Sequence, residues 1–132
     1  MADIPSQSLR SIDLFDALDQ PILSEIEKNC RWLEYSAGAA VVDFMDNDDS
    51  VCFLIEGQAR VIIYSVGGKA VAFREIEAGE WFGEYAALDG LGRSARVEAV
   101  QNCVVAKLSA QNFKDLVESD PHVNKALILE AV

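Results

Sequence analysis

The sequence predicts a mainly β domain with flanking helices, an α+β fold, and two features of the chain support this expectation. Short segments rich in Val, Ile, Phe and Tyr follow one another through the middle of the chain, with turn residues between them at near-regular intervals. Stretches with apolar residues at helical spacing stand before and after these segments. Several short strands favour a sandwich or a barrel, so we expect a compact β-roll between two helical parts.

The predicted N-terminal helices occupy about residues 8–33. The first covers Ser8 to Asp16, and the second runs from Gln20 to Trp32, with Pro21 suited to its first turn. Their apolar faces consist of Leu9, Ile12 and Phe15 in the first helix, and of Ile22, Leu23, Ile26 and Cys30 in the second.

The predicted β-roll occupies about residues 36–108. The Ser-Ala-Gly sequence at residues 36–38 is typical of a turn, and Gly67-Gly68 is a hairpin signal. The strands predicted within the roll are Ala40 to Met45, Val51 to Ile55, Ala59 to Tyr64, Lys69 to Ile76, Ala95 to Val100 and Cys103 to Leu108.

Helical spacing resumes after the roll. Ser109 is a good N-cap for a helix that Asp120-Pro121 interrupts, and the stretch from His122 to Val132 begins another. The C-terminal helices therefore occupy about residues 109–132, and we expect residues 1–132 to form a single domain. The apolar face of the first C-terminal helix consists of Phe113, Leu116 and Val117.

The composition argues against several classes of function. A formal net charge of −11 disfavours a nucleic-acid surface, which needs clustered Lys and Arg, and it disfavours binding to anionic membranes. Cys30, Cys52 and Cys103 are odd in number and form no CxxC pair, so we expect buried free thiols in a reducing, cytoplasmic setting. The N-terminus shows no signal-peptide pattern.

A single histidine, His122, limits the catalytic and metal sites that the chain could build. A cupin enzyme on a similar fold holds its metal with several histidines and a carboxylate, and a Ser/His/Asp or Cys/His arrangement also needs a placed histidine. We therefore predict no catalytic residues, no metal site and no cofactor, and we expect that the chain is not an enzyme.

The segment from Phe82 to Ala99 carries the chemistry that points to a ligand. A helix that begins near Gly83 leaves backbone N–H groups without intrahelical partners at the positive end of its dipole, which makes an anion site. Arg93 adds a planar fork suited to phosphate oxygens, and Ser94 adds a hydroxyl donor. Glu84 would repel a phosphate but would accept a hydrogen bond from a ribose 2′-OH. Together these residues suit a nucleotide monophosphate.

This segment resembles the phosphate-binding cassette of cyclic nucleotide-binding domains. The residues that carry the resemblance are Phe82-Gly83-Glu84, Leu88 and Arg93-Ser94-Ala95. The stretches LFDALDQPILSEI, EGQARVIIY and LSAQNFKDLVESDP also match that family's layout, so the resemblance covers essentially the whole chain. It implies a jelly-roll-like β-roll with a short phosphate-binding-cassette helix, and cGMP or cAMP as the ligand.

The resemblance also implies a role for each matched residue. Arg93 is expected to pair with the cyclic phosphate, together with the backbone N–H groups of Ala86 and Ser94. Gly83 and Glu84 are expected to hold the ribose 2′-OH. The residues expected to flank the base are Val61, Val71 and Phe73, on strands before the cassette.

The chain departs from the family's pattern at three positions. Gly92 stands where a proline usually precedes the arginine, and Met45 stands where a turn glycine is common. Tyr85, which we include in the ligand site, replaces the usual Leu or Ile. None of these departures removes a ligand-contacting group.

Two interpretations are open for Arg74. It is either a solvated strand residue paired with Glu75 or Glu77, which is the commoner fate of such an arginine, or a residue that recognises the base. The stretch FREIEAGEWFGE resembles cGMP-dependent protein kinases, in which an arginine at this position meets the O6 and N7 acceptors of guanine. Ser94 stands where those kinases have threonine, although serine also occurs there in cAMP binders. We therefore favour cGMP over cAMP.

The sequence thus predicts a regulatory sensor domain, which binds a cyclic nucleotide and moves its C-terminal helices to control an effector domain or a partner protein. A degenerate domain that serves only as a ligand-independent interaction module is the alternative, and the intact Gly83, Glu84 and Arg93 argue against it. A transcription regulator of the catabolite-activator type needs a helix-turn-helix after the roll, which we do not expect within this chain. The oligomeric state, including a homodimer, stays open.

Overall fold

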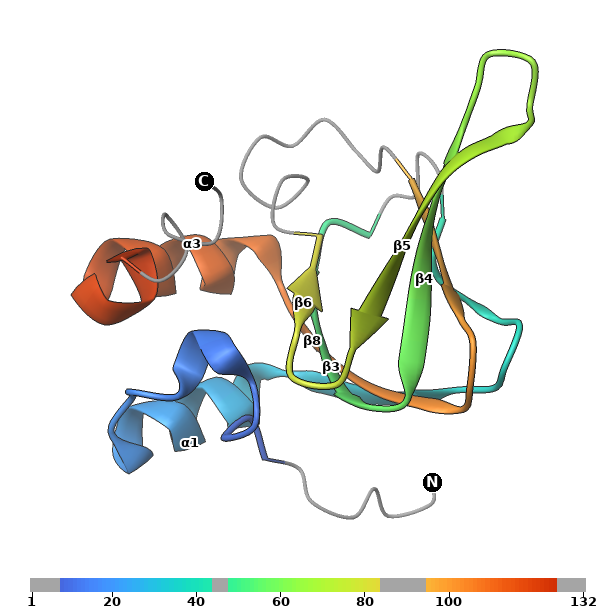
Figure 1. The fold of residues 1–132 in the computed structure, drawn as a ribbon. Helices are drawn as coiled ribbons and strands as arrows, with labels where there is room; N and C mark the ends of the chain where they lie inside the picture. Colours follow the sequence, from blue (N-terminus) through green and yellow to red (C-terminus); the bar gives the residue numbers. More distant parts are fainter. Residues whose placement is uncertain (1–7, 44–47, 84–94, 126–132) are drawn as a thin grey trace.

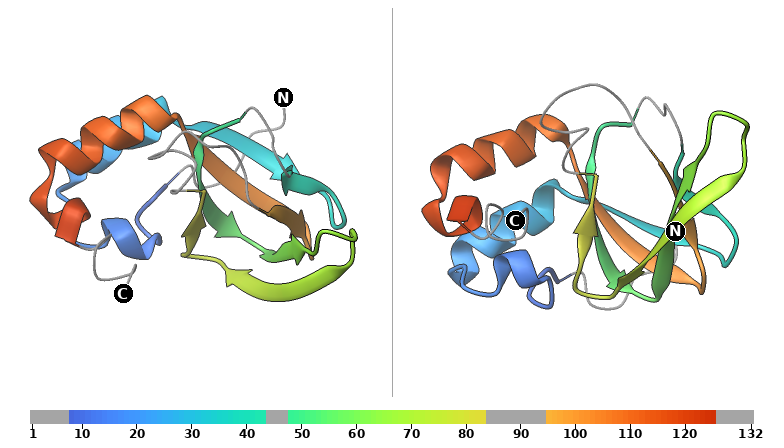
Figure 2. Two further views of the ribbon diagram at one scale, coloured as in Figure 1. Left: turned by 90° about the horizontal axis from the view of Figure 1, so that it is seen from above. Right: turned by 45° about the horizontal axis from the view of Figure 1, so that its top comes forward.

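Antiparallel strands and a group of helices make up the part of the chain that the structure describes, which is residues 8–43, 48–83 and 95–125 of a computed structural model. Figure 1 shows the helices together on one side of the molecule and the strands on the other, and the views in Figure 2 agree. The helical elements are the 3-10 helix η1 (Asp13–Phe15), α1 (Gln20–Asn29) and α3 (Ala110–Ser119). The strands are β1 (Arg31–Tyr35), β2 (Ala40–Val42), β3 (Val51–Glu56), β4 (Gln58–Tyr64), β5 (Ala70–Glu77), β6 (Trp81–Phe82), β7 (Arg96–Ala99) and β8 (Cys103–Leu108).

The strands form two four-stranded sheets within the described residues. Their order is β1-β8-β3-β6 in one sheet and β2-β7-β4-β5 in the other, and each neighbouring pair is antiparallel. This arrangement confirms the predicted β-roll. No helix within this part of the chain has the length and apolar character needed to cross a membrane.

The first predicted helix is wrong in type. Residues 8–16 form turns and the short η1 instead of an α-helix, because the backbone bonds run from Ile12 N to Leu9 O and from Phe15 N to Ile12 O. The apolar residues Leu9, Ile12 and Phe15 recur every three positions, which is the period of a 3-10 helix. All three side chains are fully buried, so the predicted apolar face is correct while the winding is tighter.

The second predicted helix is correct but too long. α1 ends at Asn29, and residues 31–35 form β1, which pairs with β8. Cys30 already has extended dihedral angles, and the indole Nε1 of Trp32 donates to the carbonyl oxygen of Glu27 at 3.2 Å, so it satisfies an acceptor at the helix end. Ile22, predicted on the apolar face, is 41% exposed.

The predicted strands are all present; β8 has the predicted bounds, and the others differ from theirs by one to three residues at one or both ends. β2 is the shortest of them and ends at Val42, while residues 44–47 lie outside the described part. The strands β1 and β6 were not predicted. β6 has two residues, too few to show an alternating pattern.

Two hydrophobic clusters fill the structure. The first joins the helical part to the sheet that contains β3, β6 and β8, and it includes Phe15, Leu23, Phe53, Trp81 and Phe113. The rings of Phe15 and Phe53 lie 5.0 Å apart between centroids. The second cluster lies between the two sheets and includes Val41, Cys52, Ile76, Phe82 and Val97.

The C-terminal helix α3 begins as predicted. The hydroxyl of Ser109 accepts a hydrogen bond from the backbone N–H of Asn112 at 3.2 Å, which is the expected N-cap. Phe113 and Leu116 are buried, as predicted from their spacing. Asp120 ends α3, and its carboxylate then accepts from the N–H groups of His122 and Val123, which caps the helical residues 121–125.

Replacing Gly57 by alanine tests the packing of the β3–β4 turn. Gly57 has φ +96°, and a Cβ there would lie 2.4 Å from the carbonyl oxygen of Asn102. We expect Gly57→Ala to lower the free energy of unfolding by roughly 2–5 kcal/mol, measured by urea denaturation. Gly68→Ala is the control, because Gly68 has φ +82° with open space around it and should lose only about 1–2 kcal/mol. Equal losses in the two variants would contradict this packing.

Candidate functional site

The short strand β6 leads directly into the predicted phosphate-binding segment. Its two residues face opposite sides, because Trp81 belongs to the cluster shared with the helices and Phe82 belongs to the cluster between the sheets. The register pairs Phe53 with Trp81 and Cys52 with Phe82, so β3 holds β6 in place. Gly83 follows at φ +92°, a conformation that favours glycine. The chain therefore turns out of the sheet at the residue that the sequence singles out.

The predicted base-binding residues come from the other sheet. Val61 on β4 pairs with Arg74 on β5 and, across its other edge, with Val97 on β7. Val61 packs against the cluster between the sheets. Arg74 lies two residues before Ile76, a fully buried member of the same cluster, so alternation along the strand places both on one face. Val61 and Arg74 are thus brought together on the face toward the roll interior.

The other predicted ligand residues divide into two groups. Val71 lies on β5 and is 59% exposed, and Phe73 pairs with Ile62 in the register, although its side chain lies outside the described part. Glu84, Tyr85, Ala86, Arg93 and Ser94 lie outside the described residues. Figure 1 shows β6 ending and β7 beginning toward the same end of the roll, so residues 83 and 95, which flank that segment, both lie toward that end.

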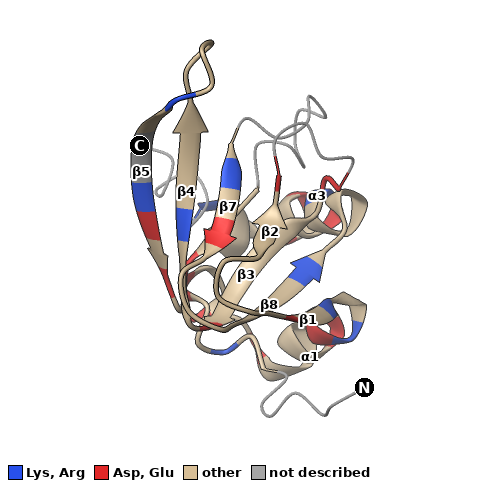
Figure 3. Ribbon diagram, turned by 90° about the vertical axis from the view of Figure 1, so that its right-hand side faces the viewer, with Lys and Arg blue, Asp and Glu red and all other residues tan. Residues whose placement is uncertain are grey.

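The carboxylates beside Arg74 have other partners. Glu75 accepts a hydrogen bond from Arg60 Nε at 3.0 Å, and Glu77 accepts one from the side-chain amide of Gln58 at 2.8 Å. Arg74 is exposed and makes no ion pair or hydrogen bond to any other described residue. The pairing of Arg74 with Glu75 or Glu77 is therefore wrong. Figure 3 shows the charged positions of β5 and β4 side by side.

A buried lysine that the sequence analysis missed lies at the same end of the roll. Lys107 on β8 is 5% exposed and pairs with Cys52, which pairs on its other side with Phe82. Its ammonium donates to the carbonyl oxygen of Val41 at 3.0 Å and to Asp48 Oδ2 at 2.9 Å. Lys107 therefore joins strand β2, strand β8 and the segment before β3. The sequence gives no local sign of the Lys107 contacts, because a buried strand position is expected to hold an apolar residue and not a lysine.

The Asp48–Lys107 pair is held in its charged form. Burial alone would raise the pKa of Asp48, but hydrogen bonds from Ser50 and Lys107 outweigh it and hold the pKa well below its usual range. Burial alone would lower the pKa of Lys107, but Cys52, Asp48 and Tyr35 raise it above its usual value. Both groups therefore stay ionised at neutral pH.

A second set of ion pairs joins Asp43, the residue after β2, to strand β7. Arg96, at the start of β7, bonds Asp43 Oδ2 at 2.8 Å and Glu98 Oε1 at 2.7 Å. The hydrogen bond to Glu98 is the main effect that raises the pKa of Arg96, and the negative charge of Asp43 raises it further. Asp43 and Asp48 flank residues 44–47, so one end of that segment is tied to β7 and the other to β8. Charged contacts therefore hold both described residues next to this segment, Asp43 and Asp48.

The cysteines and the metal-ligating side chains form no further site in this part of the chain. None of the three cysteines is in a disulfide; Cys52 and Cys103 are buried as predicted, and Cys30 is half-buried. Burial, with the nearby Glu27, raises the pKa of Cys30 to about 12. Among the described residues, no group of three His, Cys, Asp or Glu side chains is arranged to hold a metal ion.

Comparison with known proteins identifies relatives of this fold. The sequence model of a family described as the cyclic nucleotide-binding domain matches residues 32–120. The chain is 24% identical over 104 residues to the cAMP-activated global transcriptional regulator CRP of Pasteurella multocida, covering 78% of this chain and 50% of that protein. It is 25% identical over 122 residues to the neuropathy target esterase sws of Drosophila melanogaster, covering 87% of this chain and 9% of the esterase.

A solved structure of a kinase regulatory domain with cAMP has a similar fold. The regulatory domain of Toxoplasma gondii PKA, crystallised with cAMP, superposes with a TM-score of 0.80 and 27% identity, covering 93% of this chain and 46% of that chain. The chain spans about half the length of the curated bacterial regulators that it matches. The esterase shows that similar domains also occur within much longer enzymes.

Replacing Asp48 by asparagine tests the buried pair through its pH dependence. The pKa of Asp48 is depressed in the folded state, so its contribution to stability is present above the unfolded pKa of about 4 and is lost as pH falls toward the folded pKa. We expect Asp48→Asn to lose about 2–4 kcal/mol at pH 7, and the gap to wild type should narrow below about pH 4. Urea denaturation across pH measures both values.

The control for this change is Asp43→Asn, since Asp43 is 52% exposed in its pair with Arg96. Its loss should stay within about 1 kcal/mol. A loss at Asp48 no larger than that at Asp43, or a gap that persists unchanged at acid pH, would show that the buried pair does not stabilise the fold.

Proposed function

The chain belongs to the cyclic nucleotide-binding domain family, and we propose that it is a regulatory sensor domain whose ligand is a cyclic purine nucleotide. The observation that carries the proposal is the position of Gly83. The motif FGEYAALDGLGRSA begins where β6 ends, and Gly83 leaves the sheet at φ +92°. A glycine here allows close approach of a ligand to the backbone. In this proposal Arg93 and the N–H groups of Ala86 and Ser94 bind the cyclic phosphate, and Glu84 binds the ribose.

For the base, we propose Val61, Val71, Phe73 and Arg74 as the contacts, with cGMP preferred to cAMP. Arg74 is exposed, shares the inner face with Val61, and has no partner among the described residues, so its guanidinium is available to a ligand. A guanidinium fork matches the O6 and N7 acceptors of guanine. The bacterial regulator and the kinase domain described above are named with cAMP, so the preference for cGMP rests on Arg74 alone.

We propose that binding is coupled to the helices through β6. Trp81 is 8% exposed and lies in the same cluster as Phe113 and Leu116 of α3. On the turn before β6, the carbonyl oxygen of Gly79 accepts from Asp13 N at 3.0 Å, which joins η1 to the same strand. If the ligand displaces Gly83, the movement would therefore be transmitted to η1 before the roll and to α3 after it. The helices would pass the signal to an effector domain or a partner protein, and no catalytic role is proposed for this chain.

Removing the guanidinium of Arg93 tests the phosphate site. We expect Arg93→Ala to weaken binding of cAMP and cGMP about ten- to a hundredfold, because charge-assisted hydrogen bonds to the phosphate are lost. Titration calorimetry measures the Kd. Lys28→Ala is the control for charge, since it removes one positive charge at an exposed position on α1, away from the predicted ligand residues. An unchanged Kd in Arg93→Ala would contradict the role, and wild-type protein that binds neither nucleotide would favour a ligand-independent interaction module.

Removing the guanidinium of Arg74 tests the choice of base. We expect Arg74→Ala to weaken cGMP binding about five- to a hundredfold and to leave cAMP binding nearly unchanged, because only guanine offers two acceptors to the fork. Competition binding with both nucleotides gives the selectivity. Arg60→Ala on the neighbouring strand is the control, as Arg60 pairs with Glu75. Equal loss for both nucleotides, or no loss, would remove Arg74 from the base site.

A further inference from the structure

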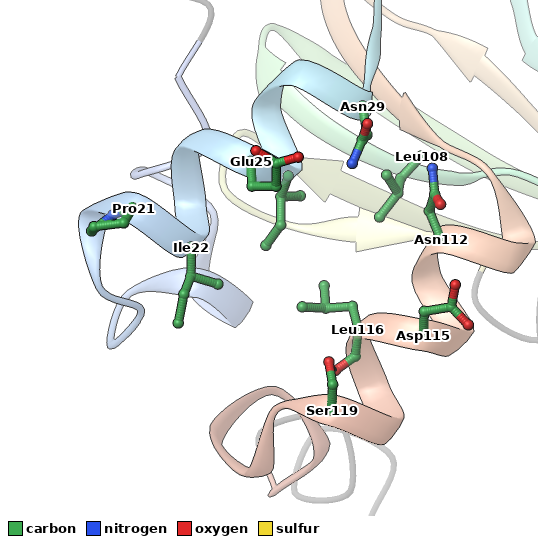
Figure 4. Close-up of a pocket in the computed structure, with 10 residues that line it drawn as sticks. Pro21, Ile22, Glu25, Asn29, Leu108, Asn112, Asp115, Leu116 and Ser119 are labelled. Atoms are coloured by element: carbon green, nitrogen blue, oxygen red, sulfur yellow. The ribbon is translucent and has the colours of Figure 1, made fainter.

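A groove separate from the nucleotide site lies between α1 and α3. It has a volume of about 490 Å³ and is lined mainly by α1 on one side and α3 on the other. Figure 4 shows Leu108 and Leu116 between the two helices, with Asn29 and Asn112 near one end and Ile22 near the other. Each helix has ten residues, or about 15 Å of length, so the groove is about three helical turns long.

The floor of the groove is apolar and its rims are open to solvent. Leu108, Ile26 and Leu116 are 1%, 7% and 9% exposed, whereas Ile22 on the rim is 41% exposed. An apolar residue exposed to this degree at the edge of a groove offers area that a partner can cover. An open groove of this length suits a row of side chains on a polypeptide better than a small enclosed ligand.

The acidic side chains of the groove favour a basic partner. Glu25 on α1 and Asp115 on α3 stand on opposite walls, and none of the described residues that line the groove is Lys or Arg. Glu25 makes no ion pair with a described residue, and Asp115 accepts only from Gln111 on its own helix, at 2.9 Å. The net charge of −11 adds long-range attraction for a basic partner. The chain's own terminal segments, residues 1–7 and 126–132, contain no Lys or Arg and lack that complementarity.

We propose that this groove is a docking site for a basic amphipathic helix of a partner protein. The helix would place apolar side chains spaced i, i+3 or i+4, and i+7 over Leu108, Leu116 and Ile22, and its flanking Lys or Arg residues would face Glu25 and Asp115. This goes beyond nucleotide binding, because the groove shares no residue with the proposed nucleotide site.

A labelled model peptide tests the proposal directly. The probe is an amphipathic helix of leucine and lysine, with a scrambled peptide of the same composition as its control, and fluorescence anisotropy on the full chain measures the Kd. The double change Glu25→Gln and Asp115→Asn should weaken binding about two- to thirtyfold, and Ile22→Ser should weaken it severalfold. The matched control, Glu34→Gln with Glu118→Gln, removes two exposed carboxylates outside the groove and should change the Kd less than twofold.

Several results would overturn the proposal. They are no binding of the probe, equal binding of the scrambled peptide, or equal weakening by the groove variants and the control variants. Binding that appears only when residues 126–132 are deleted would identify the chain's own end as the occupant instead. Self-association of the wild-type chain that Ile22→Ser abolishes would assign the groove to a second copy. Because the assay contains no nucleotide, its failure leaves the nucleotide proposal untouched.

Discussion

The alternation of Trp81 and Phe82 in the strand β6 is the constraint on which the arrangement depends. Trp81 is buried with the helices and Phe82 is buried between the sheets, so this strand belongs to both hydrophobic clusters. Because side chains alternate along a strand, a shift of one residue would exchange the two faces. It would also move Gly83 away from the point where the chain turns out at φ +92°. The packing of two side chains thus sets where the cassette begins.

The electrostatics of the roll fit a chain that is acidic overall. A net charge of −11 opposes an anionic ligand at long range, but salt screens that repulsion beyond about 8 Å at physiological ionic strength. Two cations bind the residues next to the 44–47 segment, with Lys107 bound to Asp48 and Arg96 bound to Asp43. Their charges are used within the structure, whereas Arg74 has no such partner among the described residues. This difference separates Lys107 and Arg96, which are engaged within the structure, from Arg74, whose guanidinium is available to a ligand.

The sequence predicted those parts of the molecule whose signals are local. β8, which begins with four apolar residues in a row, has the predicted bounds, and the Ser109 cap forms as expected. β1 was missed because the predicted helix, whose apolar face ended at Cys30, was extended to Trp32, and β6 was missed because two residues show no period. The same limit applies to the site. The cassette motif is local and could be identified, but the Asp48–Lys107 contact joins residues 59 positions apart and depends on the strand order.

Hydrogen exchange with and without saturating nucleotide tests most directly whether β6 links the cassette to the helices. If it does, cAMP or cGMP should increase the protection of the amides at residues 81–83 and change the protection of residues 109–125 in the same experiment. Binding shown by calorimetry with no change in either segment would contradict the link. In that case the strand would be a structural support alone, and a ligand signal would have to leave the roll by another route.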